Sequence, residues 1–175
     1  MTLLSVRGVS KRFGGLQAVN DLSFDVATGS IKALIGPNGA GKTTIFNLIS
    51  GFLPPDSGEI VFGGAEIHGM TSCEVAVRGM VRTFQHIRLF PKMTVLENIM
   101  VGRHLHSRAG FLAGMLNLPF TWEEERRIRE KSFEIMELLG IAAHAGTEAI
   151  SLAYGQQRVV EVGRALACEP KLLLL

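Results

Sequence analysis

The sequence predicts an α/β domain that carries a helical insertion, because strand-like segments lie toward both ends of the chain and helix-like segments lie between them. Residues 3–9 (LLSVRGV) and 22–26 (LSFDV) alternate apolar and polar side chains, as half-buried strands do. Residues 31–36 (IKALIG) form a short apolar run that ends in glycine, which is typical of a strand buried on both faces. Residues 171–175 (KLLLL) indicate a second central strand.

Further segments fill the space between these strands. Residues 42–52 (KTTIFNLISGF) predict a helix with Gly51 near its end. Residues 58–67 (GEIVFGGAEI) indicate strand material after a PPDSG turn, and residues 81–85 (VRTFQ) indicate an extended segment.

Two helix starts are expected from capping patterns. Residues 72–79 (SCEVAVRG) predict a short helix with Ser72 as a possible N-cap and Glu74 near the positive end of the helix. Thr94 is followed three residues later by Glu97, which is the spacing of a capping box. A helix is therefore expected to begin just after Thr94.

Residues 121–141 predict an amphipathic helix, and residues 155–170 predict another helix. The apolar residues that share one face of the first are Ile128, Ile135, Met136 and Leu139. Residues 110–120 (GFLAGMLNLPF) are apolar but too short to span a bilayer, and Pro119 is expected to end them. This segment either packs against neighbouring helices or forms a contact surface for a partner.

The composition argues against a nucleic-acid-binding, a membrane-spanning or a secreted protein. The chain has 175 residues and a formal net charge of +2, with no run of Lys or Arg, so no nucleic-acid partner is expected. No segment approaches the about 18 apolar residues of a membrane span, and the first residues do not resemble a secretory signal. Cys73 and Cys168 are expected to be reduced thiols of a cytosolic protein.

The strongest local motif is GPNGAGKTT, which fits the phosphate-binding loop pattern G-x-x-x-x-G-K-(S or T). Its residues are Gly36, Pro37, Asn38, Gly39, Ala40, Gly41, Lys42, Thr43 and Thr44. The three glycines let the backbone curl so that its N–H groups converge on an anion, and the following helix adds its positive end. Lys42 would place a cation against the β- and γ-phosphates, and the Thr43 hydroxyl could bind Mg²⁺.

The second motif is SLAYGQQR at residues 151–158, which opens a helix. Beside the phosphate loop, it resembles the signature motif of the ATP-binding cassette (ABC) family, usually written L-S-G-G-Q. The corresponding residues here are Leu152, Ala153, Tyr154, Gly155 and Gln156. Ala153 lacks a hydroxyl that in this family touches the γ-phosphate of an ATP held by the partner subunit. Because the backbone amides and the helix dipole remain, the anion site is expected to be weakened rather than lost.

Two more residues match family features in the same order along the chain. Phe13 resembles the aromatic residue that stacks on adenine, although it could instead be a core residue. Gln85 matches the glutamine that reaches Mg²⁺ and the attacking water, although alone it would be an ordinary loop glutamine. The histidines, which match no catalytic motif and are expected to be structural or exposed, are His68, His86, His104, His106 and His144.

The resemblance covers residues 3–175, and the segments RFGGLQAVNDLSF, VRTFQHIRLFPKMTVLENIMVG and LAYGQQR are similar to the ATPase subunits of bacterial branched-chain amino-acid importers. It implies an α/β fold with a P-loop NTPase core, an antiparallel β subdomain and an α-helical insertion, truncated at the C-terminus. One incomplete ABC domain would span residues 1–175, with the insertion at about residues 86–155.

In this family an apolar strand like residues 172–175 delivers an Asp that holds Mg²⁺ through water and then a Glu that polarises the attacking water. The sequence stops one residue before that Asp. We therefore expect a piece of a longer subunit, poorly folded and inactive as a separate polypeptide, since phosphoryl transfer depends on such charges.

The implied function is ATP binding and hydrolysis with Mg²⁺, in which Lys42 and Gln85 are catalytic and Thr43 and Gln85 contact the metal. The implied partners are transmembrane permease subunits, a second ABC ATPase subunit in a homo- or heterodimer and, indirectly, a substrate-binding protein. The subunit would lie at the cytoplasmic face of the inner membrane. The alternatives are an ABC ATPase of another system (lipid export, or soluble repair or translation), a regulator that binds ATP without turnover, and an unrelated phosphate-loop kinase.

Overall fold

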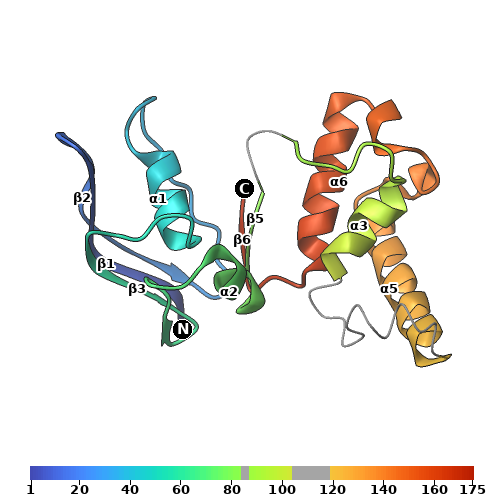
Figure 1. The fold of residues 1–175 in the computed structure, drawn as a ribbon, viewed down its shortest axis with the longest axis horizontal. Helices are drawn as coiled ribbons and strands as arrows, with labels where there is room; N and C mark the ends of the chain where they lie inside the picture. Colours follow the sequence, from blue (N-terminus) through green and yellow to red (C-terminus); the bar gives the residue numbers. More distant parts are fainter. Residues whose placement is uncertain (84–86, 104–118) are drawn as a thin grey trace. The chain divides into compact units, whose positions relative to one another are not determined.

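The computed structural model describes residues 1–83, 87–103 and 119–175, with side chains from residue 122 onward in the last range (Figure 1). The chain divides into two compact units, Met1–Met80 and Val81–Leu175. Within the described residues, we find no helix that combines the length and the apolar character needed to cross a membrane.

The first unit is built on a four-stranded antiparallel sheet in the order β2-β1-β3-β4. Its strands are β1 (Thr2–Phe13), β2 (Leu16–Ala27), β3 (Ser57–Phe62) and β4 (Ala65–Glu66). The alternation seen in the sequence buries Leu4 and Val6 of β1 and Ile60 of β3 on one face. The antiparallel β subdomain is confirmed.

Two helices accompany this sheet. Helix α1 (Lys42–Ile49) buries Ile45 and Leu48 and is followed by Gly51, as predicted. Helix α2 (Ser72–Val77) begins one residue earlier than its predicted cap allows, because Thr71 and not Ser72 is the N-cap. The reason is the position of the acid. The Thr71 hydroxyl accepts from the amide of Glu74, and the Glu74 carboxylate accepts from the amide of Thr71 at 2.7 Å, so Glu74 must be the third helical residue.

The predicted central strand at residues 31–36 is wrong for this structure. Within the described residues its backbone pairs with no strand, and Ile31 and Ile35 are 102% and 89% exposed. An apolar run indicates that a segment can be buried on both faces, but a strand also needs neighbours that accept its backbone hydrogen bonds. The composition of residues 31–36 does not show whether such neighbouring strands are present.

The second unit combines a two-stranded sheet with packed helices. Strands β5 (Met80–Arg82) and β6 (Leu172–Leu174) pair, and the Thr83 amide extends the pairing to the carbonyl of Leu174 at 2.9 Å. Residues 172–174 therefore form a strand as predicted, but the prediction of a central strand is wrong among the described residues, because β6 pairs with β5 alone. Its α-helices within the described residues are α3 (Val95–Arg103), α5 (Pro119–Leu138) and α6 (Tyr154–Ala167). Two 3-10 turns, η2 (Ala142–His144) and η3 (Ala149–Ser151), lie between α5 and α6.

The core of the second unit lies where these three helices meet (Figure 1). Its buried members are Val95, Ile99, Met136, Ile141, Leu152, Val160 and Ala167. The predicted apolar face of α5 is confirmed, because Met136 and Ile128 are buried and Ile135 and Leu139 are partly buried against this core. Most of the apolar segment 110–120 lies outside the described residues, and Pro119 begins α5 instead of ending a segment, as proline often does at the first helical position.

Helices α3 and α6 approach each other at backbone distance. A Cβ atom on Gly102 of α3 would lie 2.2 Å from the carbonyl oxygen of Arg164 in α6. Only glycine fits at this crossing, so Gly102 fixes how closely α3 packs on the helix that begins at the signature motif.

Candidate functional site

The phosphate loop, residues 36–44, leads directly into α1. Gly39 and Gly41 have φ values of +84° and +80°, in the left-handed region that glycine adopts at no steric cost. The Ala40 amide donates to the carbonyl of Pro37 at 3.3 Å, which closes a turn inside the loop. The segment before α1 is exposed from Gly36 to Ala40, so its backbone is accessible to a ligand.

Gly41 also holds the loop against the sheet. A Cβ atom at this position would lie 2.3 Å from the carbonyl oxygen of Ala18 in β2. Two separate structural features therefore require glycine at position 41: a left-handed backbone and a close approach to a neighbouring strand. This contact fixes the start of α1 relative to the sheet.

Lys42 folds back across the loop that precedes it. Its ammonium donates to the carbonyl oxygens of Gly36 and Pro37, both at 2.6 Å. No acidic residue occupies the first turn of α1 to offset the positive end of the helix. One ammonium and one uncompensated helix N-terminus therefore lie at the same loop, which is an arrangement that attracts phosphate.

The residues present also fit a magnesium ion that arrives with a nucleotide. Thr43 lies exposed in the first turn of α1, beside Lys42. Across the described ranges, no group of three or more His, Cys, Asp or Glu residues could hold a metal ion. Because Mg²⁺ keeps most of its waters and takes phosphate oxygens, it needs few protein ligands, and the Thr43 hydroxyl is the group of this turn that would hold it.

The two other predicted residues of the nucleotide site have different outcomes. Phe13 is the last residue of β1 and is 46% exposed, which does not fit a core role. The ammonium of Lys11 lies 6.0 Å from the centre of its ring. Stacking of Phe13 on adenine stays a prediction, and Gln85 lies outside the described residues.

The signature residues, 152–156, form the turn that starts α6. Leu152 is buried in the core, whereas Tyr154 is 66% exposed and Gly155 is exposed beside it. Ala153 is the N-cap and has no side-chain acceptor for the amides of the first turn. The Ala153 side chain therefore does not block those amides or the positive end of α6, and an anion site here stays a prediction.

Backbone hydrogen bonds attach the signature region to the start of α3. The amides of Val95 and Leu96 donate to the carbonyls of Thr147 and Ala145, at 2.9 and 3.2 Å. In the other direction, the Ala149 amide donates to the carbonyl of Met93 at 3.0 Å. These bonds couple residues 93–96 to residues 145–149, which lead into the signature.

A buried asparagine secures the α3 side of this connection. Asn98 is fully buried, and its side-chain oxygen accepts from the amide of Phe90 at 2.9 Å. Its side-chain nitrogen donates to the carbonyls of Phe90, Met93 and Thr94. The predicted capping box also forms, because the Thr94 amide donates to the Glu97 carboxylate at 2.7 Å and the Glu97 amide donates to the Thr94 hydroxyl. These hydrogen bonds lower the pKa of Glu97 below its ordinary value, with the Thr94 amide the largest cause.

Two side chains near the signature make contacts that the sequence did not predict. The His144 ring lies 3.0 Å from the side-chain nitrogen of Gln156, and no motif connects residues twelve positions apart. Glu161 is 2% exposed and accepts from Arg158 at 2.9 Å, a contact that raises the pKa of the Arg158 guanidinium. The three-residue spacing of this pair on a helix is a signal that sequence analysis could have used.

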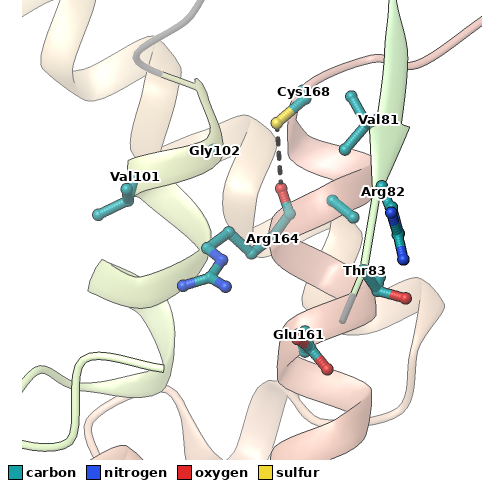
Figure 2. A pocket seen from close by; sticks show the side chains of 9 residues that line it. Val81, Arg82, Thr83, Val101, Gly102, Glu161, Arg164 and Cys168 are labelled. Carbon is teal, nitrogen blue, oxygen red and sulfur yellow. Dashed lines mark hydrogen bonds between the residues drawn. The ribbon is translucent and has the colours of Figure 1, made fainter. Parts of the chain in front are cut away.

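One pocket of the second unit is lined by none of the predicted site residues. Its volume is about 330 Å³, and it lies between β5, α3 and α6, with the Arg164 side chain reaching from α6 toward α3 (Figure 2). The lining residues are Val81, Arg82, Thr83, Val101, Gly102, Glu161, Arg164, Ala165 and Cys168.

Burial governs the charges in this pocket. It lowers the pKa of the Arg164 guanidinium and raises the pKa of the Cys168 thiol. The thiol also donates weakly to the carbonyl of Arg164 at 3.5 Å. Burial therefore disfavours the thiolate form of Cys168, and neither Cys168 nor Cys73 is in a disulfide.

The predicted site residues fall into two groups. Phe13 and the phosphate loop belong to the first unit, and residues 152–156 belong to the second. Lys42 contacts its own loop in the first group, and Gln156 contacts the amide of Ala153 in the second, at 3.2 Å.

Comparison with known proteins gives matches along nearly the whole chain. Residues 19–175 match the family model described as "ABC transporter". The chain is 41% identical over 173 residues to the high-affinity branched-chain amino acid transport ATP-binding protein LivG of Escherichia coli (strain K12), covering 99% of this chain and 68% of that protein. It is 42% identical, with the same coverage, to the high-affinity branched-chain amino acid transport ATP-binding protein BraF of Pseudomonas aeruginosa.

Solved structures give the same picture of the fold. The ADP conformation of MJ1267, described as an ATP-binding cassette of an ABC transporter, superposes with a TM-score of 0.82 at 35% identity. The match covers 99% of this chain and 67% of that one. The P-loop NTPase type of α/β fold predicted from the sequence is therefore confirmed.

Proposed function

The chain belongs to the ABC transporter family, and we propose that it is the subunit that binds and hydrolyses ATP to drive a membrane importer of branched-chain amino acids. The observation that carries the proposal is the phosphate loop, in which the Lys42 ammonium, the glycine-rich backbone and the N-terminus of α1 meet. The kind of substrate imported rests on the likeness to LivG and BraF.

ATP would bind with its phosphates against the loop. The Lys42 ammonium would exchange its bonds to the carbonyls of Gly36 and Pro37 for bonds to the β- and γ-phosphates, which are stronger acceptors because they are charged. The amides at the start of α1 would complete the anion site. Phe13, exposed at the end of β1, would stack on adenine.

Hydrolysis would require groups that position and neutralise the γ-phosphate. Thr43 would bind Mg²⁺, which neutralises phosphate charge when bound, and Gln85 would reach the metal and the attacking water. Lys42 and Gln85 are thus the proposed catalytic residues. Asp and Glu residues of the kind that this family places after its apolar strand would be needed for turnover.

A second ABC ATPase subunit, identical or related, would supply the rest of the site. In this arrangement the signature residues 152–156 of one subunit face the γ-phosphate of the ATP on the other. The exposed Gly155 and the amides of the first turn of α6, which the Ala153 side chain does not cap, support that role, because they leave the positive end of α6 accessible. Arg158, whose pKa is raised by Glu161, keeps its positive charge one turn away.

The proposed partners are two transmembrane permease subunits and, through them, a substrate-binding protein. The chain would lie peripherally at the cytoplasmic face of the membrane, where ATP is available. Since this subunit does not itself contact the amino acid, its own residues carry no specificity for leucine, isoleucine or valine.

The test compares Lys42→Ala with Lys131→Ala in the subunit assembled with its permease. Lys131 is exposed on α5 and pairs only with the exposed Glu134 in the contacts described, so its loss is a matched removal of one charge. We expect Lys42→Ala to lose leucine uptake and ATP turnover, and Lys131→Ala to retain both. Turnover without leucine uptake in the wild type would point to another ABC system, and ATP binding without turnover would point to a regulator.

A further inference from the structure

The geometry points to His144 as the positioning residue for Gln156 of the signature, an inference that rests on the proposed function of that motif. The side-chain nitrogen of Gln156 lies 3.0 Å from Nε2 of His144, and its oxygen Oε1 accepts from the amide of Ala153 at 3.2 Å. Both ends of the Gln156 amide are thus held. We found no role for His144 in any catalytic motif.

The hydrogen-bond network assigns the orientation of both side chains. The Ala153 amide can only donate, so Oε1 of Gln156 must face it and the NH₂ group must face His144. Nε2 of His144 must then accept, which places the proton of the neutral ring on Nδ1. A ring that donated from Nε2 would force Gln156 to turn over and lose its bond to Ala153.

Ala153 makes this support more important than it would be in a signature with serine at that position. A serine N-cap would accept from an amide of the first helical turn, whereas alanine cannot. At the N-cap of α6, the Ala153 amide instead donates to the side chain of Gln156. Gln156 therefore shapes the turn whose amides would face the γ-phosphate.

His144 is itself held by backbone bonds on both sides. Its amide donates to the carbonyl of Ile141 at 3.0 Å, and its carbonyl accepts from Thr147 at 2.9 Å. Thr147 in turn accepts from the amide of Val95, the first residue of α3. The backbone of η2 is thus linked to the start of α3, and the partly buried His144 ring contacts Gln156 in the signature turn.

Two substitutions of equal side-chain length separate positioning from packing. His144→Gln offers an oxygen acceptor near the position of Nε2, whereas His144→Met has neither an oxygen nor a nitrogen acceptor. In the subunit assembled with its permease, we expect His144→Met to raise the KM for ATP about three- to tenfold, the effect of losing one hydrogen bond. We expect His144→Gln to stay within about twofold of the wild type.

A second measurement does not depend on activity. In His144→Met, the amide of Ala153 should exchange with deuterium faster than in His144→Gln, because Gln156 is no longer held against it. Equilibrium binding of ATP to the phosphate loop of the separate subunit should be the same in both variants.

The outcomes distinguish this inference from the proposed function. If the wild-type complex does not hydrolyse ATP, the proposed function fails, and the exchange comparison still decides the role of His144. Equal KM values and equal Ala153 exchange in His144→Met and His144→Gln would overturn the inference. A raised KM and faster exchange in the methionine variant, restored by glutamine, would support it.

Discussion

Substituting Gly41 by alanine should disrupt the phosphate loop more than the same change at Gly39. Both residues have positive φ values, +80° and +84°, so alanine at either position pays the cost of a left-handed backbone, about 1–2 kcal/mol. Only Gly41 also faces a neighbour, because its new Cβ would lie 2.3 Å from the carbonyl oxygen of Ala18. At Gly39 nothing lies within 4 Å.

The magnitude follows from these two contributions. Relieving the contact at Ala18 requires β2 or the start of α1 to move, and overpacking of this kind typically costs about 1–3 kcal/mol. Gly41→Ala should therefore lower the free energy of unfolding by about 2–5 kcal/mol, from the sum of the two costs. Gly39→Ala should lower it by about 1–2 kcal/mol.

Urea unfolding of the subunit without nucleotide, followed by circular dichroism, measures both free energies. Nucleotide is left out because binding would stabilise the folded state and mask the difference. If Gly41→Ala and Gly39→Ala were equally stable, the close packing of the loop on β2 would be refuted as the reason for glycine at position 41.

Two further outcomes are expected. Gly102→Ala should lower the free energy of unfolding by about 1–3 kcal/mol, because its Cβ would lie 2.2 Å from the carbonyl oxygen of Arg164. Gly155→Ala is the control and should leave the free energy of unfolding unchanged, because nothing lies within 4 Å of its new Cβ. Equal thermal stability of the two variants would contradict the close packing at Gly102. The depressed pKa of Glu97 gives stability that is present above the carboxyl's usual value of 4.5 and is lost as the pH falls through the folded pKa. Glu97→Gln, which can still accept from Thr94, should therefore show a smaller loss of stability on acidification, and an unchanged pH profile in urea titrations would count against the capping box.

Motifs with a local physical cause could be predicted from the sequence. The glycine-lysine pattern predicted a loop at residues 36–44 that leads into a helix over residues 42–52, and the structure forms α1 from Lys42 to Ile49. The Thr94–Glu97 spacing predicted a capping box, which the hydrogen bonds confirm. In each case the residues that interact lie within a few positions of one another, so short-range chemistry decides the outcome.

Features that depend on distant parts of the chain could not be predicted in this way. Residues 31–36 have the composition of a central strand, but pairing partners come from elsewhere in the sequence and the segment is exposed. The contact between His144 and Gln156 depends on how η2 packs beside α6, which no spacing rule specifies. The N-cap of α2 was also predicted wrongly, by one residue. Ser72 and Thr71 are both good N-cap residues, and the position of Glu74 decides between them.

Equilibrium binding of ATP with Mg²⁺ to the purified subunit tests most directly whether the loop at residues 36–44 holds nucleotide phosphates. We expect saturable binding in the range of about 1 µM to 1 mM that is common for enzyme substrates, and a large loss of affinity when Lys42 is replaced by alanine. Absence of binding at millimolar ATP, or the same affinity in Lys42→Ala, would contradict the account.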